Sequence, residues 1–338
     1  MRRILPVVLL ALGALGLAPS PAAADPALRL SESTAVGIHN AYEKSQYTWF
    51  ADALDSGATL LEMDVWVNGV QKKWRVAHDL PIISSNNNCA SGGLRAGSRD
   101  QDLGVCLDNL RAWHNSKPNH PLLIVKIEMK NGFDGRAGMG APALDKLIAD
   151  KLGSAVFRPA DLLGSHPNLD AAARVNNWPT RAQLTGRIVF EIVPGTFEQG
   201  NPFDKYWTDV EYADHLRSLH GAGRFGQAQI FPAVLGAASG DPRTRYADVG
   251  RRPWFVVFDG SATNYVGGGG VDPRWYDTNH YLLIMTGAHE VAPVIDARNP
   301  TPEQARARVA QLAAARASVV TSDWTPATGA LPLVLPRG

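Results

Sequence analysis

Histidine and carboxylate side chains gather near the ends of three strand-like segments early in the chain. His39 follows the first of these segments, and His78 follows the third. The segment between them, residues 60–66, carries Glu62 and Asp64. Two imidazoles around a group of carboxylates suit general acid/base transfer, which contributes typically ~10²–10⁴ in rate. The pattern predicts an acid/base pair, His39 and His78, with a metal site between its members.

The carboxylates indicate which kind of metal. Glu62 and Asp64 share one face of an apolar strand, because alternate side chains of a strand point the same way. Two carboxylates on such a face repel each other, and a cation is their natural partner. Asn40 and Glu128, in or beside other strand-like segments, offer further oxygen ligands. Ligands that are all oxygen favour Ca²⁺ or Mg²⁺ over zinc, so we expect Asn40, Glu62, Asp64 and Glu128 to hold a hard cation.

An alternative interpretation of the same residues needs no metal. Lys126 and Lys130 lie on one face of residues 122–130, because their spacing is even. In this interpretation they form salt bridges with Glu62 and Asp64 across a barrel. In the metal-site interpretation they are instead free to meet a substrate phosphate.

Three further residues lie near the ends of later strand-like segments. Glu191 and Asp259 are candidates for substrate contact, although a salt bridge explains either of them equally well. His289 follows another such segment, in a position from which it can line the mouth of a barrel.

Strand-like and helix-like segments alternate along the chain. Near-continuous apolar strands separated by helices are typical of a parallel sheet that is covered on both faces. Eight strands are counted if the weak run 228–231 is included, and they predict a single distorted (β/α)₈ TIM barrel, an α/β fold with long active-site loops. The expected strands are residues 34–38, 59–66, 121–129, 187–193, 228–231, 254–258, 281–286 and 318–322. The expected helices are residues 45–55, 103–115, 141–152, 209–219 and 302–317.

The first residues have the features of a secretory signal peptide. A charged start, a short apolar run and a small-residue cleavage site occupy residues 1–24 and leave residues 25–338 as one catalytic unit. No later stretch approaches the roughly 20 apolar residues that a membrane-spanning helix needs, so we expect a secreted protein. Cys89 and Cys106 then form one disulfide, because an even pair in an exported protein is usually bridged; a thiol nucleophile is the alternative.

The charge balance narrows the range of partners. The chain has 33 Lys and Arg against 32 Asp and Glu. A near-neutral surface exerts no long-range attraction on nucleic acid or anionic lipid. Contact with a membrane must therefore come from local apolar or aromatic side chains.

Several segments together resemble a known family. Residues 37–42 (Gly-Ile-His-Asn-Ala-Tyr), 61–64 (Leu-Glu-Met-Asp) and 76–79 (Val-Ala-His-Asp) resemble the X-region signature of phosphoinositide-specific phospholipases C. Cys89, Cys106 and the segment 126–130 resemble the exported, calcium-dependent bacterial branch of that family. The similarity extends over nearly the whole chain after the signal, to residues 321–324.

This resemblance implies an activity and a role for each site residue. It implies a phosphoric diester hydrolase that cleaves phosphatidylinositol at a membrane surface, by way of a cyclic phosphate, and that acts as a monomer. His39 would stabilise the phosphorane-like transition state, and His78 would protonate the departing diacylglycerol oxygen. One Ca²⁺ would be held by the positions named above, with Glu62 or Glu128 taking the proton of the attacking hydroxyl.

Two alternative functions remain open at this stage. Glycerophosphodiester phosphodiesterases share the barrel and the His…Glu-x-Asp…His layout, but they usually carry arginine where this chain has Asn40. A catalytically silent exported barrel that binds lipid or sugar is the alternative from another class. Two histidines and four oxygen ligands argue against the silent barrel.

Overall fold

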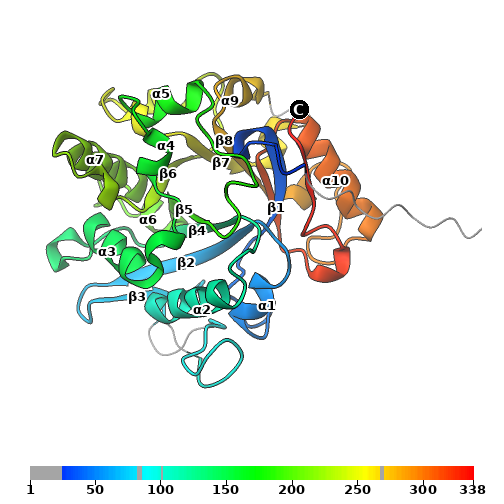
Figure 1. Ribbon diagram of the computed structural model, residues 1–338, viewed down its shortest axis with the longest axis horizontal. Helices are drawn as coiled ribbons and strands as arrows, with labels where there is room; N and C mark the ends of the chain where they lie inside the picture. The colour runs from blue at the N-terminus through cyan, green and yellow to red at the C-terminus, as the bar shows by residue number, and fades with distance from the viewer. Residues whose placement is uncertain (1–24, 82–85, 100–101, 267–269) are drawn as a thin grey trace, which may run out of the picture.

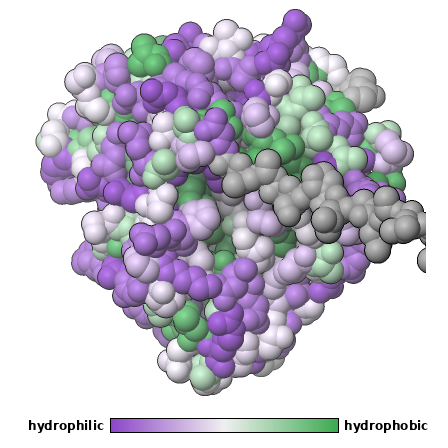
Figure 2. All heavy atoms as spheres, turned by 45° about the vertical axis from the view of Figure 1, so that its right-hand side comes forward, coloured by the Kyte–Doolittle hydropathy of each residue, from purple (hydrophilic) through white to green (hydrophobic). Residues whose placement is uncertain are grey.

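The computed structural model describes residues 25–81, 86–99, 102–266 and 270–338. The signal peptide predicted for residues 1–24 lies outside these ranges. Among the described residues, no helix is long and apolar enough to cross a membrane. Hydrophilic side chains predominate on the face shown in Figure 2, with apolar residues in small groups among them.

Eight parallel strands form a closed barrel with helices around it (Figure 1). β1 is hydrogen-bonded to β2 on one side and to β9 on the other, which closes the ring. The predicted (β/α)₈ TIM barrel is thereby confirmed. The barrel strands are β1 (Ser33–Ile38), β2 (Leu60–Asn68), β4 (Leu123–Met129), β5 (Ile188–Pro194), β6 (Ile230–Leu235), β7 (Val257–Ser261), β8 (Leu282–Thr286) and β9 (Val319–Ser322).

Two antiparallel strands extend the sheet beyond the barrel. β3 (Lys73–Val76) returns along β2 as a hairpin that projects from the barrel (Figure 1), and it places Val76 opposite Val65. β10 (Val334–Pro336) pairs with the start of β1 and was not predicted. The hairpin brings the chain back from the end of β2 to the middle of β2, where Glu62 and Asp64 lie. The residues that follow β3 therefore lie close to these carboxylates.

Helices cover the outside of the barrel. α3 (Ala141–Leu152) has the predicted bounds, and three other long helices end within three residues of theirs: α2 (Leu103–Ser116), α7 (Thr208–Gly221) and α10 (Pro302–Ala314). The helix expected at residues 45–55 is much shorter, α1 (Phe50–Leu54). The remaining short helices are α4 (Pro159–Leu163), α5 (Leu169–Arg174), α6 (Thr196–Gln199), α8 (Ala262–Tyr265) and α9 (Arg274–Thr278).

A disulfide joins Cys89 to Cys106, as predicted, with an S–S distance of 2.02 Å. Both cysteines are fully buried. Cys89 lies in the loop that follows His78, and Cys106 lies in the first turn of α2. The bridge therefore ties the loop beyond β3 to the helical layer.

Candidate active site

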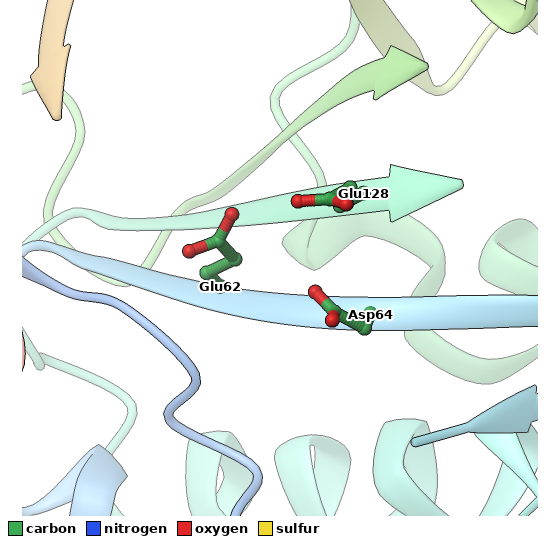
Figure 3. A group of neighbouring side chains, drawn as sticks. All are labelled: Glu62, Asp64 and Glu128. Atoms are coloured by element: carbon green, nitrogen blue, oxygen red, sulfur yellow. The ribbon is translucent and has the colours of Figure 1, made fainter. Parts of the chain in front are cut away.

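Three carboxylates meet at adjacent positions of β2 and β4. Glu62 and Asp64 come from β2, and Glu128 comes from β4, where it is the register partner of Asp64. Their ligand oxygens all lie within 4.8 Å of one another (Figure 3). Because alternate residues of a strand share a face, this cluster follows from the even spacing along each strand.

Lys130 lies between two members of the carboxylate cluster. Its ammonium group is 3.1 Å from Asp64 and 3.0 Å from Glu128. Burial, and then the negative charges of Glu128 and Glu62, raise the pKa of Asp64 to about 7. One ammonium group therefore does not balance the negative charge gathered here.

Lys126 lies one layer deeper in the barrel. It is 3.0 Å from Glu62 and 2.8 Å from Asp259, and all three side chains are buried. On the neighbouring strand β5, Glu191 is the register partner of Lys126 and is also buried. One carboxylate oxygen of Glu191 has no hydrogen-bond partner among the described residues. Burial, and then the charge of Asp259, raise the pKa of Glu191 to about 8.

The salt bridges that the metal-free interpretation predicts are therefore present, but the two lysines do not neutralise all of the carboxylates. Five acidic side chains face two lysines across the barrel interior. Three of the acidic groups offer oxygens close enough to share one ion. A donor set made only of oxygen, with negative charge in excess, fits a hard divalent cation such as Ca²⁺.

His39 occupies the end of β1 and faces this cluster. Its Nε2 lies 3.7 Å from Glu62, and its Nδ1 lies 2.8 Å from Asp323, which follows β9. Burial disfavours a charged imidazole, but the charge of Glu62 and the hydrogen bond with Asp323 outweigh this effect and raise the pKa of His39 to about 9. These contacts favour the imidazolium form of His39, whose Nε2 edge lies toward the carboxylates.

His78 approaches the cluster from the hairpin. The backbone N–H of Ala77 donates to the carbonyl of Asp64 over 3.1 Å, which fixes the residue before His78 against β2. The imidazole is half exposed, and its Nδ1 lies 3.3 Å from Asp79. The exposed face of His78 is thus open to solvent.

Asn40 and Tyr42 lie next to His39 and the carboxylates. Asn40 has a φ of 54°, a left-handed conformation that asparagine adopts more readily than most residues. The buried hydroxyl of Tyr42 donates to Asn40 Oδ1 over 3.2 Å. Burial, and then the charge of Asp64, raise the pKa of Tyr42 far above its usual range. Tyr42 therefore links the amide of Asn40 to the carboxylate cluster.

A cavity of about 280 Å³ opens beside His39 and Asp323. His289 lines it, and its Nδ1 lies 3.0 Å from the hydroxyl of Ser322. A larger cavity, about 810 Å³, lies between α3 and α7, and no predicted site residue lines it.

Sequence reasoning missed two members of the site. Asp323 directly follows β9, and its place at the end of a barrel strand was the available signal. Tyr42 lies within the first motif, but nothing in its spacing indicates that its hydroxyl turns back to Asn40 and Asp64.

The fold and the site define a class: a (β/α)₈ barrel with a histidine beside three carboxylates that could share one metal ion at its carboxyl end. Neither protein-family models nor curated protein sequences give a match. A solved calcium-dependent phosphatidylinositol-specific phospholipase C from Streptomyces antibioticus does match. It is 54% identical, with a TM-score of 0.89 over 92% of this chain and 99% of that one. This chain belongs to the calcium-dependent phosphatidylinositol-specific phospholipases C of bacteria, which confirms the family that the motifs resemble.

A more distant phospholipase C structure agrees in fold. A calcium-dependent phosphoinositol-specific phospholipase C from a Gram-negative Pseudomonas species is 18% identical, with a TM-score of 0.67 over 94% of this chain and 100% of that one. A glycerophosphodiester phosphodiesterase from Parabacteroides distasonis is 14% identical over 89% of this chain and 97% of that one, with a TM-score of only 0.44.

Proposed function

We propose that the chain cleaves phosphatidylinositol to diacylglycerol and an inositol phosphate, by way of a cyclic phosphate, in a reaction that requires Ca²⁺. The observation that carries the proposal is the meeting of His39 with the carboxylate cluster at the carboxyl end of the barrel. The 54% identity to the Streptomyces enzyme supports the same substrate class.

The two histidines divide the work in this proposal. His39, held by Asp323 and facing the carboxylates, stabilises the negative charge that develops on the phosphoryl oxygens. His78, half exposed on the hairpin, protonates the diacylglycerol oxygen as it leaves. The negatively charged Asp323 next to His39 favours the protonated form that its role needs.

Asn40, Glu62, Asp64 and Glu128 would hold the calcium ion. When bound, the ion lowers the pKa of the attacking inositol hydroxyl and neutralises phosphate charge. Glu62 or Glu128 accepts the proton of that hydroxyl. Burial opposes ionisation of Glu62, but Lys126 and His39 outweigh it and lower its pKa, so Glu62 is ionised and able to accept a proton.

Lys126, Lys130, Glu191 and Asp259 were expected to contact substrate. We propose that Lys130, at the level of the carboxylate cluster, is the member of this group that meets the phosphate. Lys126, Glu191 and Asp259 lie deeper in the barrel, and Lys126 contacts Glu62, which supports a role in orienting Glu62 from below.

We further propose that residues 1–24 direct secretion and that residues 25–338 act as one monomeric catalytic barrel at a membrane surface. The charged, apolar and small-residue segments of the leader support secretion, and so does the buried disulfide, because disulfides persist in oxidising compartments.

One comparison of substrates tests the proposal. Phosphatidylinositol, lysophosphatidylinositol and glycerophosphoinositol should be assayed side by side, with Ca²⁺ and with EDTA. We expect phosphatidylinositol to be cleaved fastest, and only with Ca²⁺. Preference for glycerophosphoinositol would favour a glycerophosphodiester phosphodiesterase, although Asn40 stands where those enzymes usually carry arginine. No cleavage of any of the three would indicate a silent binding barrel.

A further inference from the structure

The cavity of about 810 Å³ between α3 and α7 has no part in the proposed catalysis. The two helices lie next to each other on the outside of the barrel (Figure 1). Several residues that line the cavity come from segments that precede barrel strands: Val156 and Arg187 lie before β5, and Gln229 directly precedes β6. This part of the cavity therefore lies at the amino end of the barrel, away from the carboxylate cluster.

Two arginines line the cavity and share a single carboxylate. Asp161 lies 3.1 Å from Arg158 and 3.4 Å from Arg187. The Nε of Arg187 is buried and has no hydrogen-bond partner among the described residues. Lys146 also lines the cavity, but Asp150 lies 2.7 Å from its ammonium group and balances its charge. The arginines therefore leave one positive charge for a ligand to balance.

A second carboxylate at the cavity, that of Asp145, is fully occupied by groups of the protein. Its Oδ1 accepts hydrogen bonds from the hydroxyl of Tyr212 and, over 3.1 Å, from the backbone N–H of Gln229. Its Oδ2 lies 2.9 Å from Nε2 of His215. Asp145 is thus turned toward its own donors, and it fixes the imidazole of His215, which lines the cavity as well.

The rest of the lining includes small and apolar residues, among them Pro142, Ala149 and Val156. Gly226 also lines the cavity, and a Cβ added there would meet no atom closer than Nη1 of Arg158, at 4.0 Å. The space beside the arginines is therefore open. A cavity with an apolar wall and a few convergent polar groups is the usual form of a small-molecule site.

We propose that this cavity binds a small organic anion, a carboxylate or a phosphate monoester that carries a short apolar chain. Arg158 and Arg187 bind the anionic group, because the paired N–H donors of a guanidinium match the oxygens of either group. The chain lies along Ala149 and Val156. This second ligand site goes beyond the proposed function, which uses none of these residues.

Calorimetric titration of the calcium-loaded protein with four probes tests the site. Hexanoate and hexyl phosphate carry both an anionic group and a chain, whereas hexanol lacks the charge and acetate lacks the chain. We expect at least one of the two hexyl anions to bind. Hexanol and acetate should bind at least about tenfold more weakly, because each loses either the charged hydrogen bonds or the apolar contact. The tighter of the two hexyl anions identifies the anionic group that the site prefers.

A variant that fills the cavity locates the binding. Gly226 does not have a positive φ, so a larger residue fits its backbone, and the side chain of Gly226→Leu would occupy part of the cavity. We expect this variant to weaken binding of the preferred anion at least about tenfold, because the leucine displaces the apolar chain. Gly221→Leu is the matched control: Gly221 also has open space around an added Cβ, but it does not line the cavity.

A second variant removes charge without filling space. Arg158→Gln should weaken binding of the anion about tenfold and leave that of hexanol unchanged, because only the anion accepts a charged hydrogen bond. The control is Arg217→Gln, on α7, which removes a surface arginine that is likewise paired with one carboxylate, Asp248. Arg158→Gln also keeps the test complete if Gly226→Leu does not fold, which its melting temperature shows.

Three results would overturn the site. The first is no saturable binding of either hexyl anion at millimolar concentration. The second is hexanol binding as tight as that of the preferred anion. The third is binding of that anion by folded Gly226→Leu or by Arg158→Gln that equals binding by the matched control. Hydrolysis of phosphatidylinositol by Gly226→Leu should equal that of wild type, since the cavity lies away from the catalytic cluster.

Discussion

Asp323 lies 2.8 Å from Nδ1 of His39, although the two residues are 284 positions apart in the chain. The contact joins the end of β1 to the end of β9, which are neighbours in the closed barrel. A carboxylate on one nitrogen of an imidazole fixes its orientation and favours its charged form. Asp323 is thus a positioning residue for His39.

Asp323→Asn should reduce phosphatidylinositol hydrolysis about 100-fold, the lower end of what an acid/base group contributes. The amide keeps the size of the carboxylate but removes its charge, so the pKa of His39 falls. If His39 acts as an imidazolium, the decline of activity with rising pH should then begin at a lower pH than in wild type. Asp248→Asn, which removes a surface ion pair with Arg217, is the control and should leave the pH profile unchanged. An unshifted profile in Asp323→Asn would remove Asp323 from this role.

Asp64→Asn should abolish calcium-dependent activity and calcium binding. Asp64 is one of three carboxylates whose oxygens lie within 4.8 Å, and its loss removes charge that a cation needs. A ligand that binds only the folded state raises stability by about 2.7 kcal/mol at 100 times its Kd. Saturating Ca²⁺ should therefore raise the melting temperature of wild type and leave that of Asp64→Asn unchanged. Calorimetric binding as tight as that of wild type would exclude Asp64 as a ligand.

The fold was largely predictable because barrel strands are apolar on both faces and alternate with amphipathic helices. The errors have physical causes. The strand expected at residues 228–231 runs instead from Ile230 to Leu235, across Pro232, a residue that usually ends a strand. Helix α1 is short because the residues before it are held by tertiary contacts: the Asn88 side chain donates to the carbonyls of Ala41 and Tyr47.

The site was predictable where it depends on local spacing and not where it depends on closure of the barrel. The even spacing of Glu62 and Asp64 gave their common face without any structure. The partner of His39 could not be found in this way, because Asp323 approaches only when β9 pairs with β1. The same holds for β10, whose pairing with β1 joins the two ends of the described chain.

The loss of activity in His78→Ala should depend on the leaving group of the substrate, whereas the loss in His39→Ala should not. A diacylglycerol alkoxide needs a proton as it departs, whereas a nitrophenolate hardly does. We expect His78→Ala to lose far more activity on phosphatidylinositol than on nitrophenyl inositol phosphate, and His39→Ala to lose comparably on both. Equal losses for both variants on both substrates would show that the roles are wrongly assigned. Full activity of either variant would remove that histidine from the mechanism.

Replacing both cysteines by alanine should lower the free energy of unfolding by roughly 3 kcal/mol, because the Cys89–Cys106 bridge closes a short loop in the unfolded chain. Urea denaturation of the double variant and of wild type under oxidising conditions measures the difference. The bridge anchors the loop after His78, so kcat should fall as well. A double variant as stable as wild type would show that packing alone holds this loop.

Two lysine–aspartate pairs with similar N–O distances allow a test of how burial changes the loss of stability when an ion pair is broken. Lys126 lies 2.8 Å from Asp259 inside the barrel, and Lys151 lies 2.6 Å from Asp108 on the surface. Removing one partner of a buried pair leaves an uncompensated charge and costs about 3–5 kcal/mol. An exposed pair contributes only about 0–1 kcal/mol.

We therefore expect Asp259→Ala to lower the free energy of unfolding by several times more than Asp108→Ala, measured by urea denaturation at neutral pH. Asp259→Asn should recover part of the loss, because its amide oxygen still accepts a hydrogen bond from Lys126. Lys126 also holds Glu62, so Asp259→Ala should in addition weaken calcium binding, whereas Asp108→Ala should not. Equal losses of stability in the two alanine variants would mean that water or Glu191 balances the charge of Lys126 when Asp259 is absent. Asp259 would then not be needed to hold Lys126 against Glu62.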